Sequence, residues 1–243
     1  MKRKSNLMKS ADTLIGNNTS GSSEIVQMLN GTAIKFIDDT RSLFHLCEKL
    51  NKEFGSFETV RDYVIKLQTV LIKGNRRELR NFIESYSIKH REKFEHLYRN
   101  AIPFLKGNNT ILTISNSKTL LEVFSLWKKD KKSIHIIVCE SRPNEEGKIF
   151  AEQLLEREIK TTLIADSTVN LVMKKCDAVI IGADMILKNG NVINKSGSSL
   201  LALSAKYFNN PVYVLADRSK LSRRTKYKSL KYPSNELWDT EHP

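Results

Sequence analysis

The second half of the chain contains five short apolar runs, each separated from the next by a stretch with helical periodicity. The runs lie at residues 111–115, 134–139, 161–165, 178–183 and 212–216. Short apolar runs that alternate with helical segments predict parallel strands joined by right-handed crossovers. We therefore expect an α/β fold in which residues 101–243 form a Rossmann-like, mostly parallel, doubly wound sheet.

The first hundred residues have a different pattern. Their apolar side chains recur at spacings of three and four, which is typical of helices, and none of their segments is a convincing strand. Helical patterns run from residue 20 to a break near residue 55, from 60 to 71, and from 76 towards 98. The sequence thus predicts a helical domain at residues 1–100, followed by an α/β domain at residues 101–243 with a ligand crevice and a basic carboxyl-terminal tail.

The chain of 243 residues is strongly basic. It has 40 Lys and Arg against 27 Asp and Glu, which gives a formal net charge of +13. Such a charge favours anionic partners. Residues 218–231 contain seven basic residues and no acidic one. This run is either a solvated surface or a binding patch that contacts RNA, and the sequence does not choose between the two.

Several function classes have no support. The chain lacks an apolar stretch of membrane-spanning length, and no apolar core follows the basic amino terminus, so we expect neither membrane insertion nor secretion. The odd set of cysteines, Cys47, Cys139 and Cys176, indicates reduced thiols and a cytoplasmic location. No metal-ligand spacing, GxGxxG or P-loop motif is present, so we expect no metal and no bound cofactor.

The stretch at residues 180–198 concentrates polar chemistry next to a buried strand. Asp184 comes directly after the fourth apolar run, and an Asn-Gly pair at 189–190 predicts a hairpin that returns the chain to Asn194 and Lys195. A helical pattern begins just beyond, and a helix amino terminus beside a lysine suits an anion, especially phosphate. The alternative is a capped hairpin with a solvated lysine.

Polar residues also follow the other predicted strands. The tips carry Ser115 and Asn116, Glu140 to Arg142, Asp166 and Asp217. In a parallel sheet the carboxyl ends of the strands share one edge, where ligands bind. A single residue of this kind is more often a helix cap than a site residue. Polar residues at the ends of all five predicted strands, however, together favour a single ligand site at this edge.

The order of several motifs resembles a known family. The motifs are ESRPNEEGK from Glu140, IADS from Ile164, IIGAD from Ile180, NGNVINKSGSSLLALSAK from Asn189 and PVYVLAD from Pro211. They are similar to the alpha, beta and delta subunits of translation initiation factor 2B, to archaeal factor 2B-like proteins, and to ribose-1,5-bisphosphate and methylthioribose-1-phosphate isomerases. The resemblance is strong over residues 101–217 and looser around residues 20–25. It is specific for the superfamily and less so for the branch.

The resemblance also implies how the isomerase branch would work. Those enzymes use a cysteine and an aspartate to exchange protons; Asp184 matches the aspartate, and Ser115 stands where the cysteine would be. Their Arg-Gly-Ala phosphate loop is matched by residues 20–22, including Gly21 and Ser22, without the arginine. Glu146 replaces a glutamine. These three changes argue against the same isomerisation, since a hydroxyl is much harder to ionise than a thiol. A relocated thiol at Cys139 is a weaker alternative than a core residue.

The remaining matches imply a retained ligand site. Asn194 and Lys195 match the family's ligand-holding pair, Arg142 matches the arginine of its second motif, and Asn116 and Glu146 complete the expected set. By resemblance we expect a factor 2B-like binding or regulatory module that holds a phosphorylated sugar or nucleotide or contacts the initiation factor 2 machinery.

We expect this module to form a homodimer or a larger assembly, in the manner of the archaeal proteins. The alternative is an aldose-ketose isomerase acting on a phosphorylated pentose, with Asp184 as general acid/base, Ser115 or Cys139 as its partner, and Arg142 and Lys195 on the phosphate. The family's carboxyl terminus continues into a further strand segment, for which residues 232–243 offer no clear counterpart.

Overall fold

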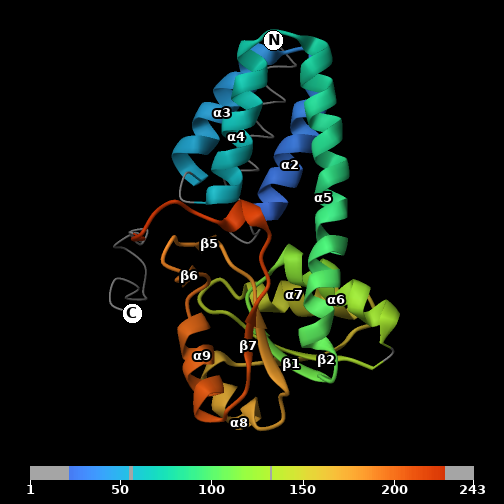
Figure 1. Cartoon of the computed structure of the whole chain (residues 1–243), viewed down its shortest axis with the longest axis vertical. Helices are drawn as coiled ribbons and strands as arrows, with labels where there is room; N and C mark the ends of the chain where they lie inside the picture. Colours follow the sequence, from blue (N-terminus) through green and yellow to red (C-terminus); the bar gives the residue numbers. More distant parts are fainter. Residues whose placement is uncertain (1–21, 55–56, 132, 228–243) are drawn as a thin grey trace.

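The computed structural model describes residues 22–54, 57–131 and 133–227 (Figure 1). Among these residues, the amino-terminal part forms four helices, α2 (Ser22–Lys35), α3 (Thr40–Phe54), α4 (Glu58–Ile72) and α5 (Arg76–Leu105). The helical pattern that begins at residue 20 is divided into α2 and α3. The division lies at Asp39, whose side-chain oxygen accepts a hydrogen bond from the backbone N–H of Ser42 at 3.1 Å, as a helix N-cap does.

Helix α5 links the helical bundle to the sheet. It begins after Asn75, whose side chain accepts hydrogen bonds from the first-turn N–H groups of Arg77 and Glu78. Near its start, Leu79 and Ile83 belong to the apolar core of the bundle. Near its end, Ala101 and Leu105 belong to the core of the sheet. The helix therefore extends past residue 98, where the sequence pattern ends, because its last turns are stabilised by the sheet.

The sheet confirms the predicted fold class. It contains β1 (Thr110–Ile114), β2 (His135–Cys139), β3 (Lys160–Ile164), β4 (Ala178–Ile181) and β7 (Val212–Val214). The spatial order is β3-β2-β1-β4-β7, and every neighbouring pair is parallel. The chain moves outward from β1 to β3 and then crosses to β4 and β7. The order therefore reverses between β1 and β4, which is where doubly wound sheets bind ligands.

Helices cover both faces of the sheet (Figure 1). On one face α5 packs with α6 (Lys118–Asp130) and α7 (Glu146–Leu155), and on the other lie α8 (Val169–Met173) and α9 (Ser198–Tyr207). Two 3-10 turns, η1 (Asp166–Thr168) and η2 (Arg218–Lys220), follow β3 and β7. The helical stretch expected between the third and fourth apolar runs is thus η1 followed by the short α8.

The Asn-Gly pair forms the predicted hairpin. Strands β5 (Met185–Ile186) and β6 (Val192–Ile193) pair antiparallel, with Met185 opposite Ile193. Gly190 has a φ of 86°, a left-handed conformation that favours glycine. The hairpin brings the chain back to the start of α9. In the part of the chain that the structure describes, no helix has both the length and the apolar character needed to cross a membrane.

Gly147 permits a close contact between α7 and the end of β2. Its backbone N–H donates to the carbonyl oxygen of Glu140 at 3.1 Å. A Cβ atom at this position would lie 1.8 Å from the carbonyl oxygen of Cys139. Only glycine allows the helix to begin so near the strand, and this contact places Glu146 at the carboxyl edge of the sheet.

Candidate functional site

Asp184 is the central ionisable group at the carboxyl edge. It follows β4, and its backbone N–H donates to the carbonyl oxygen of Ile193 at 2.9 Å, so the hairpin fixes its position. Burial raises the pKa of the Asp184 carboxyl. The ammonium groups of Lys220 and Lys195 oppose this shift, and the carboxylate of Glu146 adds to it. Two cations and two carboxylates thus interact at this end of β4.

Glu146 and Lys195 form a largely buried ion pair. The Lys195 Nζ lies 2.7 Å from Oε1 of Glu146, and the two side chains are 15% and 9% exposed. The other carboxylate oxygen of Glu146, Oε2, is buried and has no hydrogen-bond partner among the described residues. Lys195 therefore has an internal counter-ion, and an anionic ligand would have to compete with Glu146 for it.

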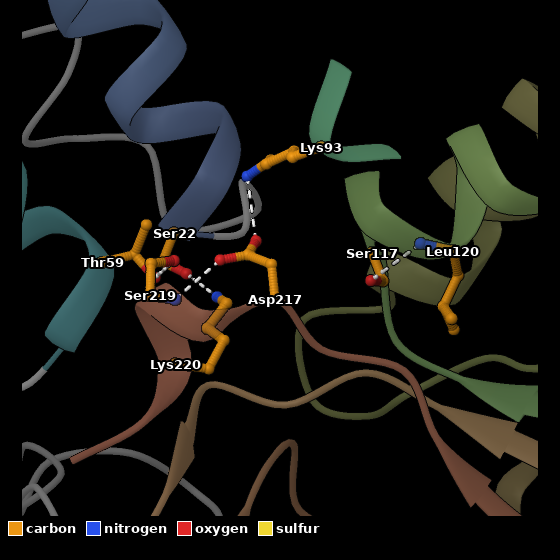
Figure 2. A network of polar contacts seen from close by, with 8 residues as sticks. All are labelled: Ser22, Thr59, Lys93, Ser117, Leu120, Asp217, Ser219 and Lys220. Carbon is orange, nitrogen blue, oxygen red and sulfur yellow. Dashed lines mark hydrogen bonds and ion pairs between the residues drawn. The ribbon is translucent and has the colours of Figure 1, made fainter. Parts of the chain in front are cut away.

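Lys220 is a site residue that the sequence reasoning did not single out. Its side chain is only 5% exposed, and its Nζ donates a hydrogen bond to the Ser22 hydroxyl at the start of α2 (Figure 2). Burial lowers the pKa of Lys220, while Asp184 and Asp217 counteract that effect and Lys93 adds to it. The residue lies within a run of basic residues that resembles a surface tail. Its burial depends on long-range packing for which the sequence carries no local signal.

The segment at residues 217–224, which we call the connecting segment, joins the sheet to the bundle through polar contacts (Figure 2). The Asp217 carboxylate lies 3.0 Å from Nζ of Lys93 on α5, and Ser219 and Thr59 of α4 share a hydrogen bond at 3.1 Å. Burial alone would raise the pKa of Asp217, but Lys93 and the hydrogen bonds from Ser219 hold it below its usual value.

The rest of the connecting segment is also anchored. The Ser222 hydroxyl donates to buried Glu58 at 2.9 Å, and Nε of Arg224 lies 3.5 Å from the same carboxylate. Lys220 and Arg224 are therefore already engaged within the protein. At these two positions the basic tail therefore contributes to the packing of the protein as well as to its surface charge. Residues 228–231 of the predicted RNA-contacting run lie outside the described residues.

The first three strand tips are connected to one another through backbone groups. Ser115 has a φ of 72°, and its N–H donates to the Ser141 hydroxyl at 2.7 Å. The N–H groups of Ser141 and Arg142 in turn donate to the Asp166 carboxylate at 2.9 and 2.8 Å. The Arg142 guanidinium pairs with Glu145 and is 46% exposed. The ion pair of Arg142 is thus separate from the pair that Lys195 forms.

Among the predicted site residues, Lys195 and Glu146 are in direct contact, and their charges act on the pKa of Asp184. Ser22 is connected to this group through Lys220, whose charge also acts on Asp184. The Asn194 amide donates to the Ser198 hydroxyl at 2.9 Å, at the start of α9. Asn116 is half-buried in the turn between β1 and α6. Gly21 lies outside the described residues.

The thiols are placed away from solvent. Cys47, Cys139 and Cys176, which are all the cysteines of the sequence, are buried and free. Burial raises the pKa of Cys139 to about 12, with smaller contributions from Asp166, Cys176 and Glu140. This disfavours a thiolate at that position. Within the described ranges no three His, Cys, Asp or Glu side chains come together in a manner that could hold a metal ion.

Comparisons with known proteins identify the family. The family model described as the initiation factor 2 subunit family matches residues 12–241. Over 126 residues the chain is 38% identical to ribose 1,5-bisphosphate isomerase of Archaeoglobus fulgidus, covering 52% of this chain and 40% of that protein. Over 120 residues it is 38% identical to translation initiation factor eIF2B subunit alpha of Caenorhabditis elegans, covering 49% and 39%. The chain thus spans about two fifths of the length of these curated relatives.

A solved structure agrees in fold. The translation initiation factor eIF-2B of Pyrococcus horikoshii OT3 superposes with a TM-score of 0.80 at 24% identity, over 91% of this chain and 82% of that one. The curated relatives include both eIF2B subunits and sugar-phosphate isomerases. The matched residues extend over nearly the whole sequence, and this chain therefore belongs to the initiation factor 2 subunit family.

Proposed function

We propose that this protein is an initiation factor 2B-like binding or regulatory module rather than an enzyme. In this proposal the polar groups at the carboxyl edge of the sheet hold a small phosphorylated ligand, a sugar phosphate or a nucleotide. The protein would then report the presence of that ligand to the initiation factor 2 machinery. The proposal rests on family membership together with the chemistry of the residues around Asp184.

The observation that carries the proposal is the chemistry at the end of β1. Ser115 stands where the resembled isomerases have a reactive cysteine, and the three thiols of the sequence are all buried. A serine hydroxyl needs an adjacent base to become a nucleophile or an acid at neutral pH. The backbone N–H of Ser115 donates to the Ser141 hydroxyl, and this hydrogen bond does not activate the hydroxyl of Ser115. The proton exchange of the isomerases thus lacks one of its two partners.

The charges around Asp184 support binding. Lys195, Lys220 and the amino terminus of α2 supply positive potential at one place. Glu146 and Asp184 balance these cations while no anion is bound, which allows the cations to remain largely buried. A phosphate group would take over part of the role of Glu146. We expect Arg142, Asn116, Asn194, Gly21 and Ser22 to contribute at the border of the same site.

Calorimetry with ribose 1,5-bisphosphate, AMP and inorganic phosphate tests the binding. We expect at least one of the organic phosphates to bind and Lys195→Met to weaken it by tenfold or more, because a charge-assisted contact is lost. Lys188→Met is the matched control, since Lys188 is an exposed lysine of the same hairpin. The proposal fails if no phosphorylated compound binds and immobilised protein retains no subunit of initiation factor 2.

One observation favours the second candidate, an aldose-ketose isomerase acting on a phosphorylated pentose. The Asp184 carboxyl has a raised pKa because it is buried, and carboxyls that titrate closer to neutral pH are suited to general acid/base catalysis. Here Arg142 and Lys195 would hold the phosphate. Steady turnover of ribose 1,5-bisphosphate or methylthioribose 1-phosphate by the native chain, abolished in Asp184→Asn, would place this candidate first.

A further inference from the structure

The ion pair between Glu146 and Lys195 leaves one carboxylate oxygen unused. Oε1 of Glu146 lies 2.7 Å from Nζ of Lys195, whereas Oε2 is buried and no described residue donates a hydrogen bond to it. An ionised carboxylate can only accept hydrogen bonds. A buried acceptor without a donor costs free energy, and folded proteins rarely leave one unsatisfied. The partner that Oε2 lacks is therefore a hydrogen-bond donor.

The position of Glu146 points to a ligand as the source of this donor. Glu146 is the first residue of α7, its side chain is 9% exposed, and its charge acts on the pKa of Asp184. An ammonium group has three N–H donors, so Lys195 can contact an anion while it keeps its pair with Glu146. A cation and an unsatisfied acceptor are thus available at one place.

The formal charges around Asp184 cancel before a ligand binds. Lys195 and Lys220 supply two positive charges, and Asp184 and Glu146 supply two negative ones when both are ionised. A phosphate dianion would leave two uncompensated negative charges in this buried group, which is costly away from water. A phosphate that carries one proton brings a single negative charge, and it also brings a P–OH donor.

We propose that Glu146 determines the specificity of this site, because its Oε2 accepts a hydrogen bond from the P–OH group of a phosphate bound in its singly protonated form. The inference rests on the proposed function, since it takes the ligand of the site to be phosphorylated. Lys195 contacts another oxygen of the same phosphate and keeps its pair with Oε1 of Glu146. A phosphate that arrives as a dianion takes up one proton from the solvent, on the oxygen that faces Oε2.

This hydrogen bond distinguishes phosphate from sulfate. A phosphate monoester has a second pKa of about 6, so its protonated form is accessible near neutral pH. Sulfate has nearly the same shape but carries no proton there, and its oxygens would face Oε2 as acceptor against acceptor. Sites built around a ligand hydroxyl strongly reject analogues that lack it, for this reason. A carboxylic acid binds a proton more weakly than phosphate does, so a proton on the protein does not remove the difference.

Other charged groups beside α7 are engaged in pairs of their own. On α6, which packs against α7, Lys118 pairs with Glu122 at 2.8 Å. Just before and within the first turn of α7, Arg142 and Lys148 both pair with Glu145. These contacts lie apart from the ion pair that holds the proposed acceptor, and the charges within each of them largely offset one another.

The ends of β2 and β3 also carry titratable groups, which are Cys139, Glu140 and Asp166. Burial raises the pKa of Cys139 to about 12, so this thiol stays protonated at neutral pH. The Asp166 carboxylate accepts two backbone hydrogen bonds from the loop after β2, and Glu140 is half-buried in that loop. Asp184, whose pKa is raised by burial, is the main competitor for a proton taken up on binding.

Calorimetry and competition test the inference. Ribose 1,5-bisphosphate and AMP are titrated at pH 8 in two buffers of different ionisation enthalpy. We expect the native chain to take up about one proton per bound ligand, and its dissociation constant to rise about tenfold from pH 7 to pH 8. Inorganic phosphate should displace the bound probe at a concentration at least tenfold lower than inorganic sulfate.

Glu146→Gln provides the matched change, because the amide keeps the size of the side chain and can donate to a dianion. This variant should bind the probes without net proton uptake and prefer phosphate over sulfate by less than threefold. Glu152→Gln, at an exposed position of α7, should behave as the native chain does. Circular dichroism checks the fold of both variants, and the comparison of phosphate with sulfate on the native chain needs no variant.

The outcomes separate this inference from the proposed function. If neither probe nor inorganic phosphate binds, both are overturned. If a probe binds and sulfate displaces it as well as phosphate does, the role of Glu146 is overturned and the phosphate site remains. If Glu146→Gln still takes up a proton on binding, the proton resides on Asp184 and the role of Glu146 is again overturned.

Discussion

Lys220 is a buried cation, and its neighbours account for its placement. Its ammonium donates to the Ser22 hydroxyl and interacts with the carboxylates of Asp184 and Asp217. A buried charge without such partners is strongly destabilising. Lys220 thus serves two purposes at once, because it holds the amino-terminal end of α2 and offsets the charge of Asp184.

The variant Lys220→Met tests this role. The methionine keeps the volume but leaves Asp184 without its strongest positive neighbour, so the pKa of Asp184 should rise further. We expect the free energy of unfolding at neutral pH to fall by about 3 kcal/mol. Urea denaturation measures the loss, and Lys226→Met, at an exposed position, serves as the control. Equal stabilities of the two variants would contradict the account.

Asp217 gives a prediction about pH. Its folded pKa is lower than the ordinary value of 3.8, chiefly because Lys93 opposes the effect of burial. The ion pair therefore contributes stability that is present above pH 3.8 and is lost as the pH falls through the folded pKa. Asp217→Asn should lower the free energy of unfolding at pH 7 by about 3 kcal/mol.

The difference between Asp217→Asn and the native chain should shrink in acid, where Asp217 is protonated in both states. Denaturant midpoints at pH 7 and in acid check this. Asp62→Asn, whose pair with Lys66 is exposed, should change little at either pH. Asp184 has the opposite sign: its raised pKa means that stability is lost as the pH rises through its folded value.

At the scale of elements, the packing of α7 on β2 depends on Gly147. In Gly147→Ala the added Cβ would meet the Cys139 carbonyl, so the helix must move away from the strand. We expect a loss of about 3 kcal/mol in the free energy of unfolding. Gly31→Ala is the control, because nothing lies within 4 Å of its added Cβ in the middle of α2. There alanine should stabilise by about 0.5–1 kcal/mol. Thermal melting of both variants would show whether the signs differ.

The elements could be predicted largely because their signals are local. The apolar runs give the strands, and the Asn-Gly pair gives the hairpin. The observed helix boundaries differ from the predicted ones where tertiary contacts or a single N-cap residue determine them. Asp39 ends the continuous pattern between α2 and α3, and the sheet extends α5 beyond residue 98. The helical stretch between β3 and β4 is too short to favour a regular α-helix over a 3-10 turn throughout, and it forms η1 and the short α8.

The site was less predictable than the fold. Asp184 and Glu146 lie at the carboxyl ends of parallel strands, and the Asn-Gly hairpin returns the chain to Lys195, so these local signals bring the three residues to one edge. The position of Lys220 depends on the return of the connecting segment to α2 and α4, which no periodicity encodes. The place of Arg142 beside the phosphate stays a prediction, and its guanidinium pairs with Glu145 in the structure.

At the scale of the whole molecule, the bundle and the sheet are joined by α5 and by the connecting segment (Figures 1 and 2). Asp184 interacts with the charge of Lys220, which contacts α2 at the place where the connecting segment meets the bundle. An anion that alters these charges would therefore also alter the contact between the sheet and the bundle. Such a site could pass on the presence of a ligand without chemical turnover. Our proposal of a binding module relies on this arrangement.

Proton NMR of ribose 1,5-bisphosphate mixed with stoichiometric protein tests the central claim, because one sample reports both binding and conversion. We predict that the sugar resonances broaden with the native chain, that the broadening is lost in Lys195→Met, and that no ketose resonances appear over many hours. Ketose formation by the native protein that disappears in Asp184→Asn would contradict the account and identify the protein as an isomerase.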